Sequence, residues 1–501
     1  MTPGGSDAVF FDVVVVGAGL SGIAAGHYLQ ALCRSRSYVI LESRQAIGGT
    51  WDLFRYPGVR SDSDMFTLGY SFRPWTSDSS FAPGPEIRNY VADTAREEGI
   101  DRHIRFGHRV TGAAWDSRTA RWTVSVSTAD GPPLSLQCSF LFFCSGYYDY
   151  EGGHEPEWPG RENFAGRIVH PQHWPADVDH AGRKVVVIGS GATAVTLVPE
   201  MAATAGHVTM LQRSPSYIVA LPGRDGIGAA LRRHLPGGLA WRIVRWKNIL
   251  LTTAFYQYAR RWPERARRVL IRAAQRRLGP GFDGEKHLSP AYNPWDQRLC
   301  IAPDADLFKA VRSGKASIVT DTIERFTPGG VLLASGVELP ADIIVTATGL
   351  RLKMLGGSQL TVDGKAVQLS KALVYRGMMY SGVPNMAVAS GYTNASWTLK
   401  CELVTQFACR ILNHMAARGL DTCVPVAAPD AAETTQPYLD LTSGYIQRSA
   451  ESLPRQGKRR PWRMYQNYLL DMLSLKFSPL LDGVLLFGHR RPKAAQAVEQ
   501  D

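Results

Sequence analysis

Two glycine-rich turns constrain the fold of this chain more than any other feature. The first turn, residues 17–22, follows the strand-like run 9–16, and the second, residues 189–194, follows the run 184–188. Each turn leads into a stretch compatible with a helix, which is the order that opens a Rossmann-like unit. The turn residues expected to approach a nucleotide are Gly17, Gly19, Ser21, Gly22, Gly189, Gly191, Thr193 and Ala194. We therefore predict an α/β protein with two Rossmann-like dinucleotide-binding domains.

The residue that ends the second strand of each unit distinguishes the two nucleotides. Glu42 lies 23 residues after Gly19, close to the ~20 residues expected for a carboxylate that binds ribose hydroxyls. The corresponding strand of the second unit ends instead at Arg213 and Ser214, which suit a 2′-phosphate. Two β-turn-α units with incidental charges are the alternative, but the agreement of both signals disfavours it. We expect FAD in the first unit and NADPH in the second.

The domain boundaries follow from these units. We expect residues 8–145 to begin the FAD domain and residues 340–490 to complete it, because the run 341–350 is typical of the returning strand in such flavoproteins. Residues 146–182 are predicted to be a linker, and 183–339 the NADPH domain with a helical insert at 224–278.

The insert carries the basic character of the whole chain. Residues 224–278 hold fourteen Arg and Lys residues but only Asp225 and Glu264 as acids, so their net charge equals the +12 of the full sequence. A solvated helical face explains this, and a weak peripheral contact with anionic lipid is the alternative. Nucleic-acid binding is disfavoured, because no recognised binding module accompanies the charge.

Composition narrows the remaining classes. The chain is 45% hydrophobic and 20% charged, as in ordinary globular proteins. Its seven cysteines form no C-x-x-C pair or zinc spacing, which argues against a disulfide framework, a disulfide reductase and a metal site. No signal peptide and no uninterrupted apolar run of ~18 residues is visible. We expect a cytoplasmic protein, with membrane association through the insert and the oligomeric state left open.

Two longer patterns carry a family resemblance. Residues 164–175 match F-x-G-x-x-x-H-x-x-x-W-P, and residues 49–62 match G-x-W-x-x-x-x-[FY]-P-G-x-x-x-D. Together they resemble the fingerprints of the type I Baeyer–Villiger monooxygenases. The strings 292–300 and 391–400 are similar to the branch of that family that contains ethionamide monooxygenase.

The resemblance implies a reaction. Such enzymes use NADPH, FAD and O₂ to form a C4a-peroxyflavin, which inserts one oxygen atom next to a carbonyl and gives an ester or lactone. The implied substrate is a small carbonyl or sulfur-containing molecule. S- or N-oxygenation of sulfides, thioamides or amines is the alternative, because the same flavin adduct supports both.

The resemblance also implies roles for particular residues. Arg298 corresponds to the catalytic arginine, and Asp62 to the carboxylate that orients it. Thr50 and Trp51 would line the flavin, and Val110 would lie near the adenine, although simple strand packing is the slightly favoured explanation of Val110.

Two details qualify this assignment. Many relatives have Lys-Arg where this chain has Gln297-Arg298, so Arg213 and Ser214 are left with more of the 2′-phosphate contact. His170 lies in the predicted linker, and we expect it to set hinge geometry by hydrogen bonding rather than to act in catalysis.

Overall fold

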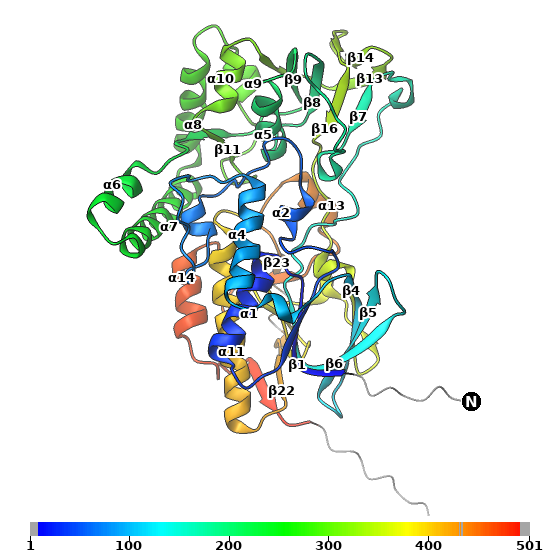
Figure 1. Cartoon of the computed structure of the whole chain (residues 1–501), viewed down its shortest axis with the longest axis vertical. Helices are drawn as coiled ribbons and strands as arrows, with labels where there is room; N and C mark the ends of the chain where they lie inside the picture. Colours follow the sequence, from blue (N-terminus) through cyan, green and yellow to red (C-terminus); the bar gives the residue numbers. More distant parts are fainter. Residues whose placement is uncertain (1–8, 430, 432–433, 491–501) are drawn as a thin grey trace, which may run out of the picture.

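Two open sheets with helices packed on them organise the molecule. The computed structural model describes residues 9–429, 431 and 434–490. In Figure 1 the sheet that contains the N-terminal strand occupies the lower half, and the second sheet lies above it with a group of helices at its side. The predicted α/β class, with two Rossmann-like units, is confirmed by these two sheets.

The first sheet has nine strands, in the order β18-β17-β4-β5-β6-β1-β2-β3 with β21 also paired to β6. Its strands are β1 (Val9–Val16), β2 (Tyr38–Leu41), β3 (Ile104–Arg105), β4 (His108–Asp116), β5 (Arg121–Thr128), β6 (Leu134–Phe143), β17 (Gln359–Val362), β18 (Lys365–Ala366) and β21 (Met386–Val388). β1 pairs in parallel with β2 and β6. Val13, Val14 and Val15 are fully buried because both faces of this central strand are covered.

Helices from both ends of the sequence belong to the first unit. They are α1 (Leu20–Leu32), α2 (Thr50–Leu53), α3 (Met65–Leu68), α4 (Gly84–Glu97), α11 (Trp397–Arg418), α13 (Gly444–Ser449) and α14 (Tyr468–Met472), the last continued by the short π-helical turn η6 (Leu473–Phe477). α1 and α11 lie side by side in Figure 1, and their apolar residues share one core with α4. The first unit is therefore built from two stretches far apart in the chain.

Smaller elements complete the first unit. They are the strand pairs β19 (Val374–Tyr375) with β20 (Met379–Tyr380), β22 (Thr422–Pro425) with β25 (Leu485–Gly488), and β23 (Thr435–Pro437) with β24 (Arg455–Gly457), and the turns η1 (Asp101–His103), η4 (Met354–Gly357) and η5 (Leu369–Lys371).

The second sheet has five parallel strands in the order β12-β9-β8-β16-β7. They are β7 (Arg167–Val169), β8 (Lys184–Ile188), β9 (His207–Gln212), β12 (Ala316–Thr320) and β16 (Ile343–Thr346). Around them lie α5 (Ala192–Met201), α9 (Gly284–Leu288), α10 (Asp306–Arg312), β10 (Ile218–Leu221), β11 (Cys300–Pro303), β13 (Ile323–Thr327), β14 (Gly330–Leu333), β15 (Glu338–Pro340), η2 (Arg161–Asn163) and η3 (Pro171–His173). The buried apolar residues of its strands form two clusters, both separate from the two large clusters of the first sheet.

The structure corrects the predicted boundaries at two strands. The run 341–350 was expected to return to the first unit, but β16 pairs in parallel with β8 and with β7, so it is a strand of the second sheet. The predicted linker 146–182 likewise contributes β7 to that sheet. Both strands are short apolar runs whose partner depends on long-range register, which their sequence does not encode. The chain returns to the first sheet at β17.

The predicted helical insert consists of three helices beside the second sheet. They are α6 (Gly226–His234), α7 (Gly237–Arg261) and α8 (Pro263–Leu278). α8 packs toward β10, whereas α7 packs against α3 of the first unit. The insert therefore touches both units.

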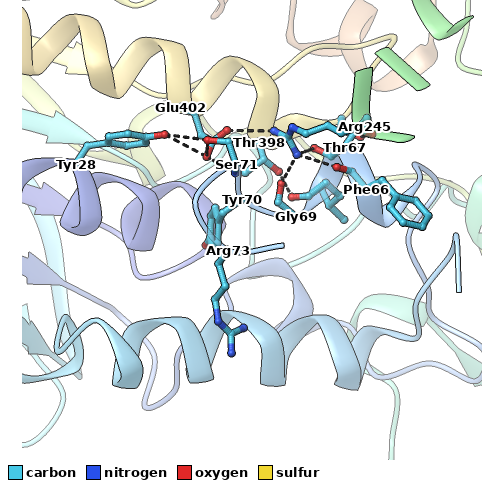
Figure 2. A network of polar contacts seen from close by, with 12 residues as sticks. Tyr28, Phe66, Thr67, Gly69, Tyr70, Ser71, Arg73, Arg245, Thr398 and Glu402 are labelled. Atoms are coloured by element: carbon cyan, nitrogen blue, oxygen red, sulfur yellow. Dashed lines mark hydrogen bonds and ion pairs between the residues drawn. The ribbon is translucent and has the colours of Figure 1, made fainter. Parts of the chain in front are cut away.

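A buried ion pair fixes α7 to the first unit, as Figure 2 shows. Arg245 donates to the carbonyl oxygens of Phe66 and Gly69 at 2.8 and 2.7 Å, and its other terminal nitrogen contacts Glu402 of α11 at 3.2 Å. Glu402 also accepts from the backbone N–H of Ser71 at 2.8 Å. Arg245 is only 5% exposed, so this one basic residue does not belong to a solvated face.

Candidate functional site

A cavity of about 1740 Å³ lies between the two units and receives residues from both glycine-rich turns. This volume exceeds the ~300–1,000 Å³ of a pocket for one drug-sized ligand. Of the residues predicted from sequence, those that line it are Gly17, Gly19, Ser21, Glu42, Thr50, Trp51, Asp62, Val110, Gly189, Gly191, Thr193, Arg213, Ser214 and Arg298. The exceptions are Gly22 and Ala194, which lie behind the turns.

The first turn needs its glycines for two separate reasons. Gly17 has φ +102°, and a Cβ there would lie 2.8 Å from the carbonyl oxygen of Cys144. At Gly22 a Cβ would lie 1.8 Å from the carbonyl oxygen of Gly17, so only glycine lets α1 start this close to β1. The turn therefore brings the N-terminus of α1, with its free N–H groups and positive dipole end, to the cavity wall.

Glu42 is held at the cavity wall by the backbone. One carboxylate oxygen accepts from the N–H of Ala18 at 2.7 Å, and the other accepts from the N–H of Arg44 at 2.8 Å. Burial raises the pKa of Glu42, while these two N–H groups act in the opposite direction. A carboxylate has about four acceptor sites, so acceptor capacity remains for hydroxyl groups in the cavity.

The second turn leaves more open space than the first. Gly189 has φ +146°, and a Cβ there would lie 2.3 Å from the carbonyl oxygen of Ala347. At Gly191 a Cβ would meet nothing within 4 Å, which leaves the space before the N-terminus of α5 clear. Arg213 and Ser214 follow β9 with exposed side chains that line the same cavity. The cationic end of the second unit is thus accessible to a ligand.

Arg298 lies on the cavity wall among tyrosines. Its terminal nitrogen Nη2 donates to the Tyr147 hydroxyl at 2.9 Å, and its Nε is buried without a hydrogen-bond partner. Burial opposes the charge, but the phenols of Tyr147, Tyr445 and Tyr148 and the carboxylate of Asp62 raise the pKa of Arg298 well above its ordinary value. The guanidinium therefore stays charged at the cavity wall, and its Nε has no partner in the protein.

Asp62 does not orient Arg298 directly in this structure. Its side chain is exposed, and among the described residues no ion pair within 4.0 Å joins it to Arg298. Asp62 acts on the guanidinium only through its electric field. The expected orienting contact is made instead by the Tyr147 hydroxyl.

Tyr147 is a residue that the sequence reasoning missed. It comes shortly after the carboxyl end of β6, next to Gly146, and its ring lies 5.1 Å from that of Trp397 at the start of α11. Ligands of open α/β sheets bind outside the carboxyl ends of the strands, so this position carried a usable signal.

Residues of the two family patterns contribute to packing and to local hydrogen bonds as well as to the cavity wall. Tyr56 packs against the core of the second unit, and a Cβ at Gly58 would lie 2.9 Å from the side chain of Glu200, so the segment 49–62 bridges the units. His170 lies outside the cavity lining, and its Nδ1 accepts from the N–H of Gln172 at 3.2 Å to cap η3. The non-catalytic, hydrogen-bonding role predicted for His170 is consistent with this contact.

Comparison with known proteins agrees with this architecture. Residues 12–378 match the family described as flavin-binding monooxygenase-like. The chain belongs to this family. It is 54% identical over 480 residues to the FAD-containing monooxygenase EthA of Mycobacterium tuberculosis, covering 96% of this chain and 98% of that protein. It is 50% identical to the putative FAD-containing monooxygenase MymA of the same species, covering 95% of this chain and 97% of that protein.

The fold of this flavin monooxygenase is shared with a solved structure described as oxidized steroid monooxygenase bound to NADP. The TM-score is 0.73 at 22% identity, with 93% of this chain and 97% of that chain covered. Within the described residues no helix combines the length and apolarity needed to cross a bilayer. The same residues contain no group of His, Cys, Asp and Glu side chains that could hold a metal ion.

Proposed function

We propose that this flavin monooxygenase uses NADPH and O₂ to convert a ketone or aldehyde into an ester or lactone. The observation that carries the proposal is Arg298, a permanent cation with an unpartnered buried Nε on the wall of a cavity that both nucleotide turns share. The relatives named FAD-containing monooxygenases and the NADP-bound fold relative support the choice of cofactors.

The first unit has residues that fit FAD. Gly17 and Gly19 present backbone and the N-terminus of α1 to a pyrophosphate, and Glu42 retains acceptor sites for ribose hydroxyls. Thr50 and Trp51 would line the flavin ring. Val110 of β4 lines the cavity and would lie near the adenine. It is also buried in the sheet core, so packing accounts for part of its role.

The second unit has residues that fit NADPH. The open space before Gly191 admits a pyrophosphate, and the accessible side chains of Arg213 and Ser214 would contact the 2′-phosphate. The fully buried Ala194 lets α5 pack closely on β8. We propose on this basis that the first unit is the FAD domain and the second the NADPH domain.

Bound FAD, reduced by NADPH, would supply the activated oxygen for the reaction. The chain's own residues hold the reactants and stabilise charge. Arg298 offers donors to negative charge that develops at the substrate carbonyl, and a preorganised donor of this kind needs no reorganisation during the reaction. Tyr147 holds Nη2 of the guanidinium, and the side chain of Arg298 lines the cavity in which that charge would develop. Asp62 strengthens the charge on Arg298 from a distance.

An uncoupling screen tests this function. NADPH consumption and oxygenated product are measured together for linear, cyclic and aryl ketones and for an organic sulfide, in one preparation. Ester or lactone formed in proportion to NADPH supports the proposal. Sulfoxide from the sulfide with no ester from any ketone would replace it with the S-oxygenase alternative.

A second part of the proposal concerns location. We infer that the basic insert gives a weak peripheral contact with anionic lipid, because most of its arginines are exposed. These exposed arginines are Arg224, Arg233, Arg242, Arg260, Arg261, Arg265, Arg268, Arg272, Arg276 and Arg277.

A further inference from the structure

The outer face of α7 carries an unusual stripe of exposed apolar side chains. Leu239, Ile243, Trp246 and Leu250 follow one another at helical spacing and are 46%, 41%, 40% and 50% exposed. Leu251 beside them is 61% exposed. A groove on the surface is lined by the same residues. Scattered apolar residues are normal on a protein surface, but a contiguous stripe marks an interaction site.

Along α7, which carries the stripe, every charged side chain is basic, and Lys247 at the groove is paired with Asp225, which caps the preceding helix. No acidic residue occurs between Gly226 and Trp262, whereas Arg242 lies within the stripe and Arg233 and Arg261 lie near its two ends with exposed side chains. An apolar face with a basic surround is the pattern of a helix that lies in the interface of an anionic membrane. A second copy of this chain fits less well, because a symmetric pairing of α7 would bring like charges together.

The segment that follows the neighbouring helix also carries exposed apolar side chains. The ring of Trp246 lies 6.0 Å from that of Tyr468, so α14 packs beside α7 at the edge of the molecule, as Figure 1 shows. Leu473 and Phe477 in η6, which continues α14, are 52% and 65% exposed. Both α7 and η6 therefore expose apolar side chains at the surface of the molecule.

The groove on α7 adjoins the wall of the central cavity. Lys247 and Leu251 line both the groove and the cavity, and Ile249 and Phe255 of the same helix line the cavity alone. One helix thus separates the outer apolar surface from the space assigned to the substrate. Lys247 and Leu251 are therefore the residues at which the groove and the cavity meet.

We propose that the outer face of α7 docks on the surface of an anionic bilayer, and that the enzyme takes lipophilic substrates from that bilayer past Lys247 and Leu251. The substrate part rests on the proposed monooxygenase function. The docking part rests only on the apolar stripe and the basic residues around it.

Vesicle binding tests the docking surface. The purified flavoprotein is sedimented with vesicles of phosphatidylcholine and phosphatidylglycerol, and with phosphatidylcholine alone. We expect binding to the mixed vesicles, and we expect Ile243→Glu and Leu250→Glu to reduce the affinity at least about tenfold, since each change removes an apolar contact and adds a repelled charge. Val337→Glu is the matched control, because Val337 is 53% exposed but lies in the second unit outside the insert. Flavin content and melting temperature verify that each variant folds.

Three results would overturn the docking surface. They are absence of binding to the mixed vesicles, equal binding of wild type and both glutamate variants, and a wild-type dimer that Leu250→Glu converts to a monomer. If wild type and both glutamate variants bind equally and salt releases them fully, the contact with the vesicle is electrostatic and does not involve the apolar stripe. If Leu250→Glu converts a dimer to a monomer, a second copy of the chain covers this face.

Turnover tests the substrate part. Dodecanone dissolved in the mixed vesicles and butanone in water are compared. We expect Leu250→Glu to raise the KM for dodecanone at least about tenfold and to leave both the kcat and the KM for butanone unchanged, because neither Leu250 nor Ile243 lines the central cavity. Equal KM changes for both ketones, or none, would overturn lipid-phase access. Vesicle binding with no oxygenation of either ketone would instead contradict the proposed function and leave the docking surface standing.

Discussion

The guanidinium of Arg298 donates from Nη2 to the hydroxyl of Tyr147 at 2.9 Å, while its Nε has no partner. One terminal nitrogen of the guanidinium is therefore fixed by the protein, and the side chain as a whole lines the cavity. This asymmetry separates the residue that stabilises charge from the residue that positions it, and the two can be tested one at a time.

Arg298→Ala should abolish ester formation while FAD still binds. Loss of one preorganised donor costs about 2.7–4 kcal/mol in the transition state, or a factor of ~10²–10³ in rate. Any remaining NADPH oxidation should yield hydrogen peroxide in place of ester. Product analysis with a peroxide assay checks this, and a wild-type ester yield per NADPH would show that Arg298 is not catalytic.

Tyr147→Phe should reduce the ester yield less than Arg298→Ala does. The change removes one hydrogen bond to a charged group, worth ~1.5–3 kcal/mol, but leaves the ring against Trp397. We expect kcat to fall about tenfold or more with little change in the KM for NADPH. Asp62→Asn is the comparison, because Asp62 makes no direct ion pair with Arg298, and we expect a smaller loss from it. A larger loss for Asp62→Asn would reverse the assignment.

Arg213→Ala should erode the preference for NADPH over NADH, mainly through KM. A charge-assisted contact to the 2′-phosphate contributes ~1.5–3 kcal/mol, or roughly ten- to a hundredfold. Steady-state kinetics with both nucleotides measure this, and the KM for NADH should not change. Equal use of the two nucleotides by the wild-type enzyme would contradict the role of Arg213.

Arg245→Ala should destabilise the protein strongly, because Glu402 would be left as an unpaired charge in the core. Breaking one partner of a buried ion pair costs about 3–5 kcal/mol. Arg242→Ala, three residues earlier on the exposed face of α7, is the control and should change little. Thermal unfolding of the flavin-loaded protein compares them. Equal melting temperatures would mean that the pair contributes nothing to stability.

Acid should selectively weaken the start of the insert. Burial alone would raise the pKa of Asp225, but the ion pair with Lys247 and the N–H of Gly228 lower it below its ordinary value. A carboxylate with a lowered pKa stabilises the folded state above the unfolded pKa of ~3.9, and this stabilisation is lost as pH falls through the lower folded value.

The variant Asp225→Asn isolates that contribution. Its stability should fall below wild type by about 1 kcal/mol near neutral pH, and the difference should shrink below about pH 4. Asp130→Asn, at an exposed position, serves as the control. Melting temperatures across the acid range measure the difference. A difference that is independent of pH would contradict the ion pair.

The local features of this chain were predictable from sequence, and the long-range ones were not. The turns at Gly17 and Gly189 and the strand-end residues Glu42 and Arg213 are encoded by short-range patterns, and they line one cavity. The placement of β16 in the second sheet depends on register between distant strands. The position of Tyr147 after β6 was a usable signal for the cavity, but its contact with Arg298 joins residues far apart in the chain and was not predictable.

The burial of Arg245 could not be predicted from the sequence either. In the sequence it is one of fourteen basic residues in the insert, and nothing in its spacing distinguishes it from its neighbours. Only the packing of α7 against α3 and α11 makes it a buried partner of Glu402. The charge count therefore predicted the exposed basic character of the insert, but it was wrong for Arg245, which is buried.

The link between Arg245 and Glu402 also limits how this enzyme could be recombined with its relatives. The arginine belongs to the insert and the glutamate to a helix more than one hundred and fifty residues later. A chimera whose new insert lacks an arginine at this position would leave Glu402 unpaired, whereas one that exchanges α11 with the insert takes both halves of the contact from one parent. Crossover points in such hybrids are therefore set by a contact that no single segment contains.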